Sequence, residues 1–218
     1  MDLTISSEKI GNPLLLELLR KLTNSFNKMG REFYVIGATA RDIVMQQLLD
    51  TESRRRTRDL DIAIAIPDWD TFEQVKQKLI ADGFEKSMDM QQRFFYGDYE
   101  LDIVPYGVVA KEDDNIYWPP EEVVAMSVKG FDEVLSEAIT VSIDDEFYVK
   151  IASLHGLFLL KLNAGSIEMQ RQARTLRICH LSFLTTLWQI LIEKYIKKYM
   201  IGKTLMNISL EAIGWLTI

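Results

Sequence analysis

The chain has 218 residues, 48% of them hydrophobic, which is enough for one domain with a real core, alone or with an appendage. Its net charge of −7 argues against a broad nucleic-acid-binding surface but leaves room for a local basic stripe. The single Cys179 cannot form an internal disulfide, the first residues lack the features of a secretory signal, and the longest apolar stretch, residues 181–192, is too short to cross a bilayer. We therefore expect a cytoplasmic protein without a membrane span.

The charge is distributed unevenly along the chain. Residues 164–218 contain seven basic and three acidic residues and no aspartate, which gives this segment a charge of +4, whereas the first 163 residues carry −11. A change of composition this sharp marks a boundary. We therefore predict a domain over residues 1–163, followed by a helical or poorly ordered tail over residues 164–218.

The first predicted elements are a helix, a strand and a second helix. An amphipathic helix is predicted to begin behind Asn12-Pro13 and to stop at Gly30. The run "EFYVIG" then predicts a short buried strand. The run "TARDIVMQQLLD" predicts a helix whose N-cap is Thr39.

Strands dominate the next part of the chain. After a polar connector, "DLDIAIAI" predicts a strand, and the segment that follows it predicts a helix capped by Asp68. The runs "RFFY" and "YELDIV" predict two strands joined at Gly97-Asp98, and a later hairpin is predicted to turn at Asp144-Asp145. An apolar helix is predicted over residues 152–164. The fold class is therefore α/β, or α+β, with a mixed β-sheet flanked by helices.

Two aspartates stand at the start of the strand "DLDIAIAI". Because side chains alternate along a strand, Asp59 and Asp61 share one face, while Leu60, Ile62 and the later isoleucines share the face that enters the core. Like charges this close repel each other and favour the binding of a divalent cation. Mg²⁺ is the ion we expect, because it takes hard oxygen ligands and is commonly held by carboxylates and substrate phosphates.

A third acid lies on a later strand. If "RFFY" pairs with "YELDIV", a neighbouring strand brings Asp102 beside Asp59 and Asp61. Three carboxylates on adjacent strands suit a two-metal site for phosphoryl transfer. Upstream, Gly37 lies between a strand and a helix, where a residue without a side chain lets backbone amides approach a triphosphate, with the Thr39 hydroxyl as a further donor.

The order and spacing of these motifs resemble the nucleotidyltransferase superfamily, which includes CCA-adding enzymes, antibiotic nucleotidyltransferases and the AbiEii-type toxins of abortive-infection systems. The resemblance is strongest to the bacterial, toxin-type AbiEii-like branch, and it covers most of residues 33–164. The runs that carry it are "VIGATARDI", "TRDLDIAIAIPDWDTFEQVK", "ELDIVPYG", "WPPEEVVAMSVKGFDEVL" and "ASLHGLFLLKLNA".

This resemblance implies a nucleotidyltransferase palm with Mg²⁺, and transfer of a nucleoside monophosphate from an NTP to an acceptor hydroxyl. It places the metal-binding, catalytic carboxylates at Asp59, Asp61 and Asp102, with Asp102 also placed to help activate the acceptor. The acceptor would be the 3′ end of a tRNA, a protein hydroxyl or a small molecule. If the chain is the toxin-like part of a two-gene system, an antitoxin protein is a further partner. The alternative is a catalytically inactive nucleotide- or partner-binding module with the same fold.

The same resemblance places Gly37, Ala38 and Thr39 in the triphosphate-binding turn. Many members of the family have a second glycine or a serine where this chain has Ala38, which matters only if a serine hydroxyl is needed for the contact. Arg41 is a further candidate for nucleotide binding, although it could equally form a surface pair with Asp42 on the same helix.

The tail departs from the family pattern. A helix like "LFLLKLNA" is usually followed there by an acidic segment with Lys-Asp-Ala-x-Asp, thought to serve the active site, whereas this chain runs "GSIEMQRQARTLRICHLSF". We hypothesise that a one-nucleotide deletion near codon 164 shifted the reading frame, because allowed codons for residues 163–180 let the neighbouring frame read "NAWIDRNAKAGKDAEDMS". A divergent basic helical tail is the alternative. A shifted frame predicts an intact carboxylate core with weak or no transferase activity.

Overall fold

The computed structural model describes residues 2–49, 58–120 and 122–171, and those up to Gly165 belong to one compact unit. Its strands, in chain order, are β1 (Asp2–Ile5), β2 (Tyr34–Ile36), β3 (Asp59–Ala65), β4 (Glu85–Lys86), β5 (Arg93–Tyr96), β6 (Tyr99–Tyr106), β7 (Asn115–Trp118), β8 (Val123–Ser127), β9 (Ile139–Ile143) and β10 (Phe147–Ile151). The helices are α1 (Ser7–Ile10), α2 (Pro13–Lys28), α3 (Gly37–Leu49), α4 (Trp69–Ala81), α5 (Phe131–Ser136) and α6 (Leu154–Arg171).

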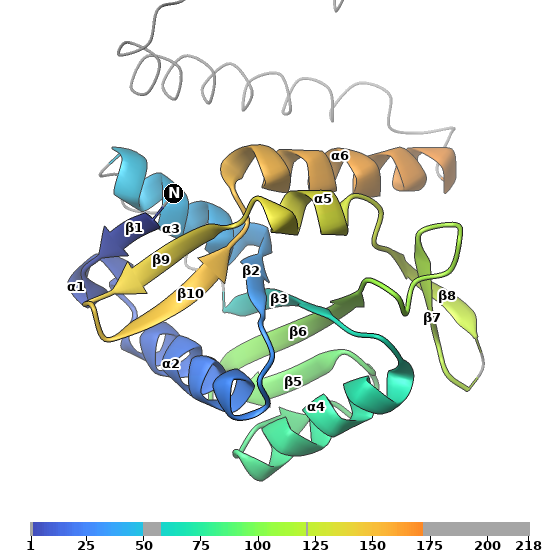
Figure 1. Cartoon of the computed structure of the whole chain (residues 1–218), viewed down its shortest axis with the longest axis horizontal. Helices are drawn as coiled ribbons and strands as arrows, with labels where there is room; N and C mark the ends of the chain where they lie inside the picture. Colours follow the sequence, from blue (N-terminus) through green and yellow to red (C-terminus); the bar gives the residue numbers. More distant parts are fainter. Residues whose placement is uncertain (1, 50–57, 121, 172–218) are drawn as a thin grey trace, which may run out of the picture. The chain divides into compact units, whose positions relative to one another are not determined.

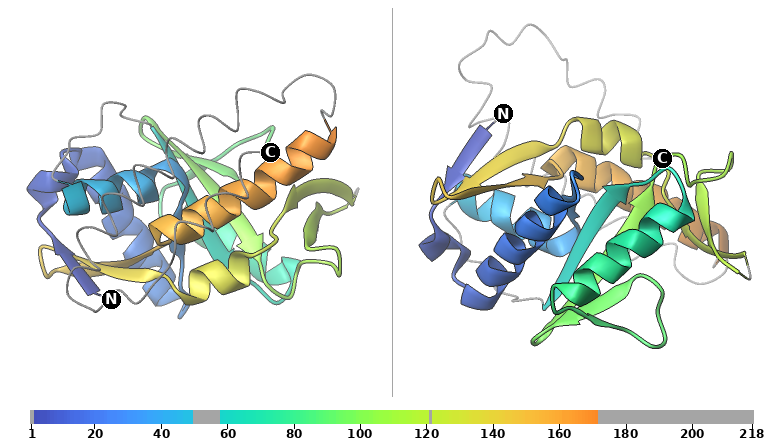
Figure 2. Two further views of the ribbon diagram at one scale, coloured as in Figure 1. Left: turned by 90° about the horizontal axis from the view of Figure 1, so that it is seen from above. Right: turned by 60° about the horizontal axis from the view of Figure 1, so that its bottom comes forward.

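Eight of these strands form one mixed sheet in the order β1-β9-β10-β2-β3-β6-β5-β4, and β7 pairs with β8 in a separate two-stranded sheet. Near the centre of the large sheet, β3 runs antiparallel to β2 and parallel to β6. Helices α2 and α4 cover one face of the sheet, and α3, α5 and α6 cover the other (Figures 1 and 2). The predicted mixed sheet flanked by helices is confirmed.

Local capping chemistry starts two of the helices where the sequence predicted. Asn12 accepts a hydrogen bond from the Leu15 N–H at 3.2 Å, and α2 follows with Pro13 as its first residue. Asp68 accepts a hydrogen bond from the Thr71 N–H at 2.7 Å and caps α4 in the same way. Both predicted helix starts are confirmed.

The two predicted hairpins are also present. Strands β5 and β6 pair antiparallel through Gly97-Asp98, and Gly97 has a φ of +56°, a left-handed conformation that suits glycine. Strands β9 and β10 turn at Asp144-Asp145, whose φ values are +51° and +58°. Aspartate tolerates this region better than most residues, which explains why a pair of aspartates marks the turn.

The predicted start of the second helix is wrong. Helix α3 begins at Gly37, directly after β2 ends at Ile36, so Thr39 lies inside the first turn and does not act as an N-cap. The buried Thr39 hydroxyl instead donates a hydrogen bond to the backbone carbonyl of Asp59 at 3.0 Å. The side chain thus joins α3 to the start of β3.

Burial anchors β3 on both faces. Leu60, Ile62 and Ile64 are fully buried on the predicted core face, where each such side chain contributes roughly 1.5–3 kcal/mol. On the other face Ala63 is equally buried and belongs to a cluster with residues of β2, β6 and α5. The two ends of the strand reach solvent, because Asp59 and Ala65 are exposed, and Asp61 near the start is half-buried.

The end of the described chain bears on two further predictions. Helix α6 continues to Arg171, past the predicted end of the apolar helix at residue 164. The division between a domain over residues 1–163 and a tail stays a prediction, because residues 172–218 lie outside the described part. None of the described helices is long and apolar enough to span a membrane.

Candidate functional site

The pairing of β3 with β6 brings two of the predicted carboxylates together. Asp61 and Asp102 are direct partners in the parallel register of these strands, and Asp59 is opposite Glu100. Since side chains at partner positions point to the same face of a sheet, Asp59, Asp61 and Asp102 all lie on one face. The prediction that a neighbouring strand places Asp102 beside Asp61 is confirmed, and Asp59 lies one step along the same face, opposite Glu100.

Gly37 makes room for one of these carboxylates. Ile36 pairs with Asp61 across β2 and β3, so the next residue begins α3 directly against the Asp61 side chain. Gly37 has a φ of +69°, and a Cβ atom at this position would overlap with a carboxylate oxygen of Asp61. A residue without a side chain is therefore required here for both conformational and steric reasons.

The other predicted nucleotide-binding residues lie in the first turns of α3. Ala38 is half-buried, and the Thr39 hydroxyl is engaged by the Asp59 carbonyl. Arg41 is exposed and donates to the Asp42 carboxylate from Nε at 2.8 Å and from Nη2 at 2.7 Å, which is the surface pair foreseen as the alternative. Nucleotide binding by these residues stays a prediction.

The electrostatics of the site are dominated by Asp61. Burial, followed by the negative charges of Asp102 and Asp59, raises the pKa of Asp61 to about 6, and the positive charges of Arg93 and Lys161 partly oppose this rise. In the absence of a cation, a carboxyl group of this kind is partly protonated near neutral pH. A bound cation would favour its charged form.

Arg93 is a site residue that the sequence interpretation missed. It donates to the Asp102 carboxylate from Nε at 2.8 Å and from Nη2 at 2.7 Å. Its Nη1 also pairs with Glu100 at 2.5 Å. The register of the β5–β6 hairpin was enough to find it, because a turn with Tyr96 opposite Tyr99 places Arg93 opposite Asp102.

Lys161 is a second missed residue. It is exposed on α6, yet its charge is close enough to lower the pKa of Asp61. In the sequence, Lys161 stands out as the only charged residue in the apolar run "LFLLKLNA". Sequence periodicity does not show which way a helix faces the sheet, so the pairing with Asp61 needed the structure.

The donor set matches Mg²⁺ in kind, since hard carboxylate oxygens are its usual protein ligands. Within the described ranges, however, no group of three or more Asp, Glu, His or Cys side chains is close enough to hold a metal ion. Asp102 is instead engaged with Arg93 through both of its oxygens. Metal binding by Asp59, Asp61 and Asp102 stays a prediction.

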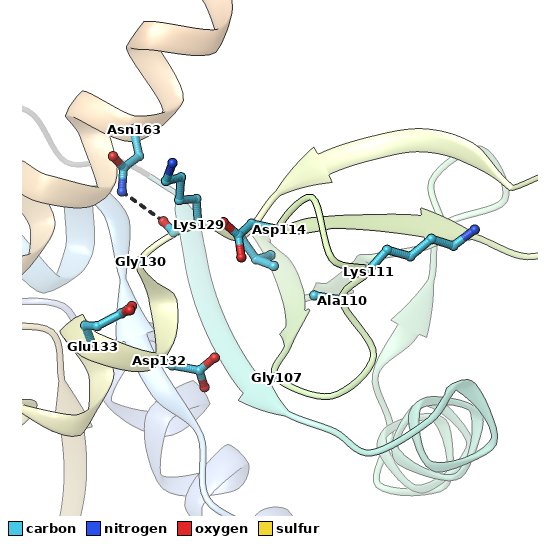
Figure 3. A pocket seen from close by; sticks show the side chains of 10 residues that line it. Gly107, Ala110, Lys111, Asp114, Lys129, Gly130, Asp132, Glu133 and Asn163 are labelled. Carbon is cyan, nitrogen blue, oxygen red and sulfur yellow. Dashed lines mark hydrogen bonds between the residues drawn. The ribbon is translucent and has the colours of Figure 1, made fainter.

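A pocket of about 340 Å³ lies elsewhere in the domain, between the segment after β6, the start of α5, and α6 (Figure 3). Asn163 projects toward it and donates to the Lys129 carbonyl at 3.0 Å. The pocket begins at Gly107, about 16 Å along β6 from Asp102 at the usual rise per residue. None of the predicted site residues lines it. Its polar lining residues are Lys111, Asp114, Lys129, Asp132, Glu133 and Asn163.

Comparison with known proteins identifies distant structural neighbours. No protein-family model matches the chain. No curated protein matches it either. Among solved structures, the lincosamide antibiotic adenylyltransferase LnuA, bound to lincomycin, is 20% identical with a TM-score of 0.40, over 66% of this chain and 83% of that one.

Two more structures are similar at the same level. A candidate nucleotidyltransferase from Thermotoga maritima is 13% identical with a TM-score of 0.45, over 75% of this chain and 92% of that one. ANT(2″)-Ia, in complex with adenylyl-2″-tobramycin, is 14% identical with a TM-score of 0.41, over 85% of this chain and 98% of that one. None of the three is described as AbiEii-like. At these identities and TM-scores, the case for function depends on the residues of the site.

Proposed function

We propose that the chain is a Mg²⁺-dependent nucleotidyltransferase that moves a nucleoside monophosphate from an NTP to an acceptor hydroxyl. The observation that carries this proposal is the junction between β2 and α3. Gly37 lets the start of α3 lie directly against the Asp61 carboxylate, and Asp61 is in register with Asp102 on the adjacent strand. A side-chain-free helix start next to paired carboxylates suits a triphosphate that is bound together with a cation.

Each predicted residue has a place in this scheme. Asp59, Asp61 and Asp102 would hold two Mg²⁺ ions, which supply charge neutralisation and activate the attacking oxygen when bound. The backbone at Gly37, Ala38 and Thr39 would bind the triphosphate through the start of α3. Arg41 would exchange Asp42 for the nucleotide. Asp102 would also help to activate the acceptor hydroxyl.

The finer assignment rests on the motif resemblance alone. On that basis we propose the toxin-like part of a toxin–antitoxin or abortive-infection system, with an antitoxin protein as partner. The acceptor is the 3′ end of a tRNA, a protein or a small molecule, and acceptor screening separates these three. Asp61 and Asp102 are half-buried on two interior strands, whereas Asp59 at the start of β3 is exposed, which would allow a large acceptor to approach.

The direct test is release of pyrophosphate from labelled NTPs by the full chain with Mg²⁺. We expect release by the wild type and its loss in Asp61→Ala. The matched control is Asp89→Ala, which removes an exposed aspartate from the loop before β5. NTP binding without pyrophosphate release would refute the transferase proposal and support the inactive binding module. Equal release by wild type and Asp61→Ala would refute the role of the carboxylates.

A further inference from the structure

Arg93 is bound tightly to the carboxylates of β6. Three of its side-chain nitrogens are engaged, because Nε and Nη2 donate to the two oxygens of Asp102, and Nη1 pairs with Glu100. Only 26% of the Arg93 side chain and 23% of the Asp102 side chain are exposed. A two-point arginine–carboxylate contact with this little exposure is among the stronger polar interactions in proteins.

This contact has a consequence for any ligand of Asp102. Both carboxylate oxygens already accept from Arg93, so a cation that approaches Asp102 competes with the guanidinium for the same carboxylate. The described residues contain no set of three carboxylates close enough to share a metal ion. In the metal-free protein, a guanidinium therefore balances the charge of Asp102 in the place where a cation would act.

Glu100 gives Arg93 a second partner. It lies two residues before Asp102 on β6, on the same face of the sheet, and is opposite Asp59 in the register with β3. If Asp102 turned away, Arg93 would still be paired with Glu100. An arginine left without any partner in a half-buried site would be costly, so Glu100 makes an exchange at Asp102 feasible.

We propose that Arg93 is a resident counter-ion of Asp102, which the divalent cation must displace before the three-carboxylate site is complete. Asp102 then exchanges its two hydrogen bonds with Arg93 for coordination, and Arg93 stays on Glu100. The strength of the Arg93–Asp102 contact therefore sets the apparent affinity for the metal. This inference rests on the proposed function, because it assumes that the cation binds at Asp59, Asp61 and Asp102.

The opposite role makes the opposite prediction. If Arg93 instead stayed bound and held Asp102 in the orientation that binds the metal, weakening the contact would weaken metal binding. Arg93→Lys separates the two roles, because lysine keeps the positive charge but lacks the planar two-point donor. The matched control is Arg58→Lys. Arg58 lies next to Asp59 and pairs with the exposed Asp98 at 3.1 Å.

The experiment is a Mn²⁺ titration of the full chain, with free Mn²⁺ measured by electron paramagnetic resonance and with competition by Mg²⁺. We expect Arg93→Lys to bind Mn²⁺ about tenfold more tightly than wild type. This factor corresponds to one charge-assisted hydrogen bond to Asp102 that the cation no longer has to break. Arg58→Lys should stay within about twofold, as for a surface pair. In an Asp102→Asn background, Arg93→Lys should give no gain. Unchanged or weaker binding by Arg93→Lys overturns the proposal.

A measurement on the wild type covers the case in which Arg93→Lys does not fold. The Arg93 Nε–Hε resonance, assigned through bonds in the ¹⁵N-labelled protein, should move on saturation with Mg²⁺, and an unmoved resonance overturns the proposal. The two proposals can fail separately. If wild type binds Mn²⁺ and releases pyrophosphate while Arg93→Lys shows no tightening, only the counter-ion role fails. If neither binds Mn²⁺, the metal site fails, and the counter-ion role fails with it.

Discussion

Replacing Gly37 by alanine tests the contact between α3 and the Asp61 carboxylate. The substitution has two costs. The φ of +69° is a left-handed conformation, which costs an L-residue about 1–2 kcal/mol. The new Cβ would also overlap with the Asp61 carboxylate, and relief of such overpacking typically costs a further ~1–3 kcal/mol. We therefore expect Gly37→Ala to lower the free energy of unfolding by about 2–5 kcal/mol.

The chain offers a matched control in Gly30, after the end of α2. Gly30 has a φ of +63°, and no atom lies within 4 Å of the position that its Cβ would take. Gly30→Ala therefore has the conformational cost alone, about 1–2 kcal/mol. Urea unfolding of both variants, followed by circular dichroism, gives the difference between them. That difference measures the steric contact with Asp61.

A double-mutant comparison then assigns the excess cost to its partner. In an Asp61→Ala background the Cβ of residue 37 no longer meets a carboxylate oxygen, and only the Cβ of residue 61 stays close, at 3.2 Å, so most of the extra loss in Gly37→Ala should vanish. Gly37→Ala would then cost little more than Gly30→Ala. The reasoning is refuted if Gly37→Ala is no worse than Gly30→Ala in the wild-type background. It is refuted as well if the full excess persists without the Asp61 carboxylate.

Three further substitutions and one sequencing experiment test other features. Because the folded-state pKa of Asp61 is raised to about 6, its ionisation opposes folding. In EDTA, wild type should therefore lose about 2–3 kcal/mol relative to Asp61→Asn as the pH rises from 4 to 7, and parallel pH profiles in urea unfolding would contradict this. Asp68→Ala should lower the free energy of unfolding in the same assay, because α4 loses its cap, and by more than Asp70→Ala in the first turn; equal losses would rule out the cap. Thr39→Val should cost about 1–2 kcal/mol because it leaves the Asp59 carbonyl without its hydroxyl donor, and Thr39→Ser should recover most of this. For the tail, sequencing the gene separates the two hypotheses: the Lys-Asp-Ala-x-Asp motif in the neighbouring frame would support the frameshift and a weakened transferase, and stop codons there would leave the divergent basic tail.

Much of the fold was accessible from the sequence because its signals are local. The caps at Asn12 and Asp68 and the turn at Asp144 depend on a few neighbouring atoms, so the residue type alone indicates them. The alternation in β3 likewise placed Asp59 and Asp61 on one face. Thr39 shows where local reasoning failed. A threonine before a helical pattern suggests a cap, but the turn at Gly37 had already started the helix.

Long-range features were harder to infer. The order of strands in the sheet joins β1 to β9 and β2 to β10, and no local pattern specifies such pairings. Arg93 was missed for a different reason, since the predicted hairpin already implied its register with Asp102. The chemical motif consists of acids alone, so it does not point to an arginine on the neighbouring strand. The position of Lys161 near Asp61 depends on how α6 packs against the sheet, which periodicity does not determine.

The strand pairings also determine when the site can assemble during synthesis. Strands β2, β3, β5 and β6 all lie between Tyr34 and Tyr106, so the ribosome has made every carboxylate of the site long before it reaches codon 164. Strand β1 must instead wait for β9, because Asp2 pairs with Thr140. Closing that long loop is entropically unfavourable, and we expect it to be slower than the pairing of strands that are close in sequence. A nascent chain could therefore form the carboxylate cluster while its first strand is still unpaired, whatever sequence the tail goes on to have.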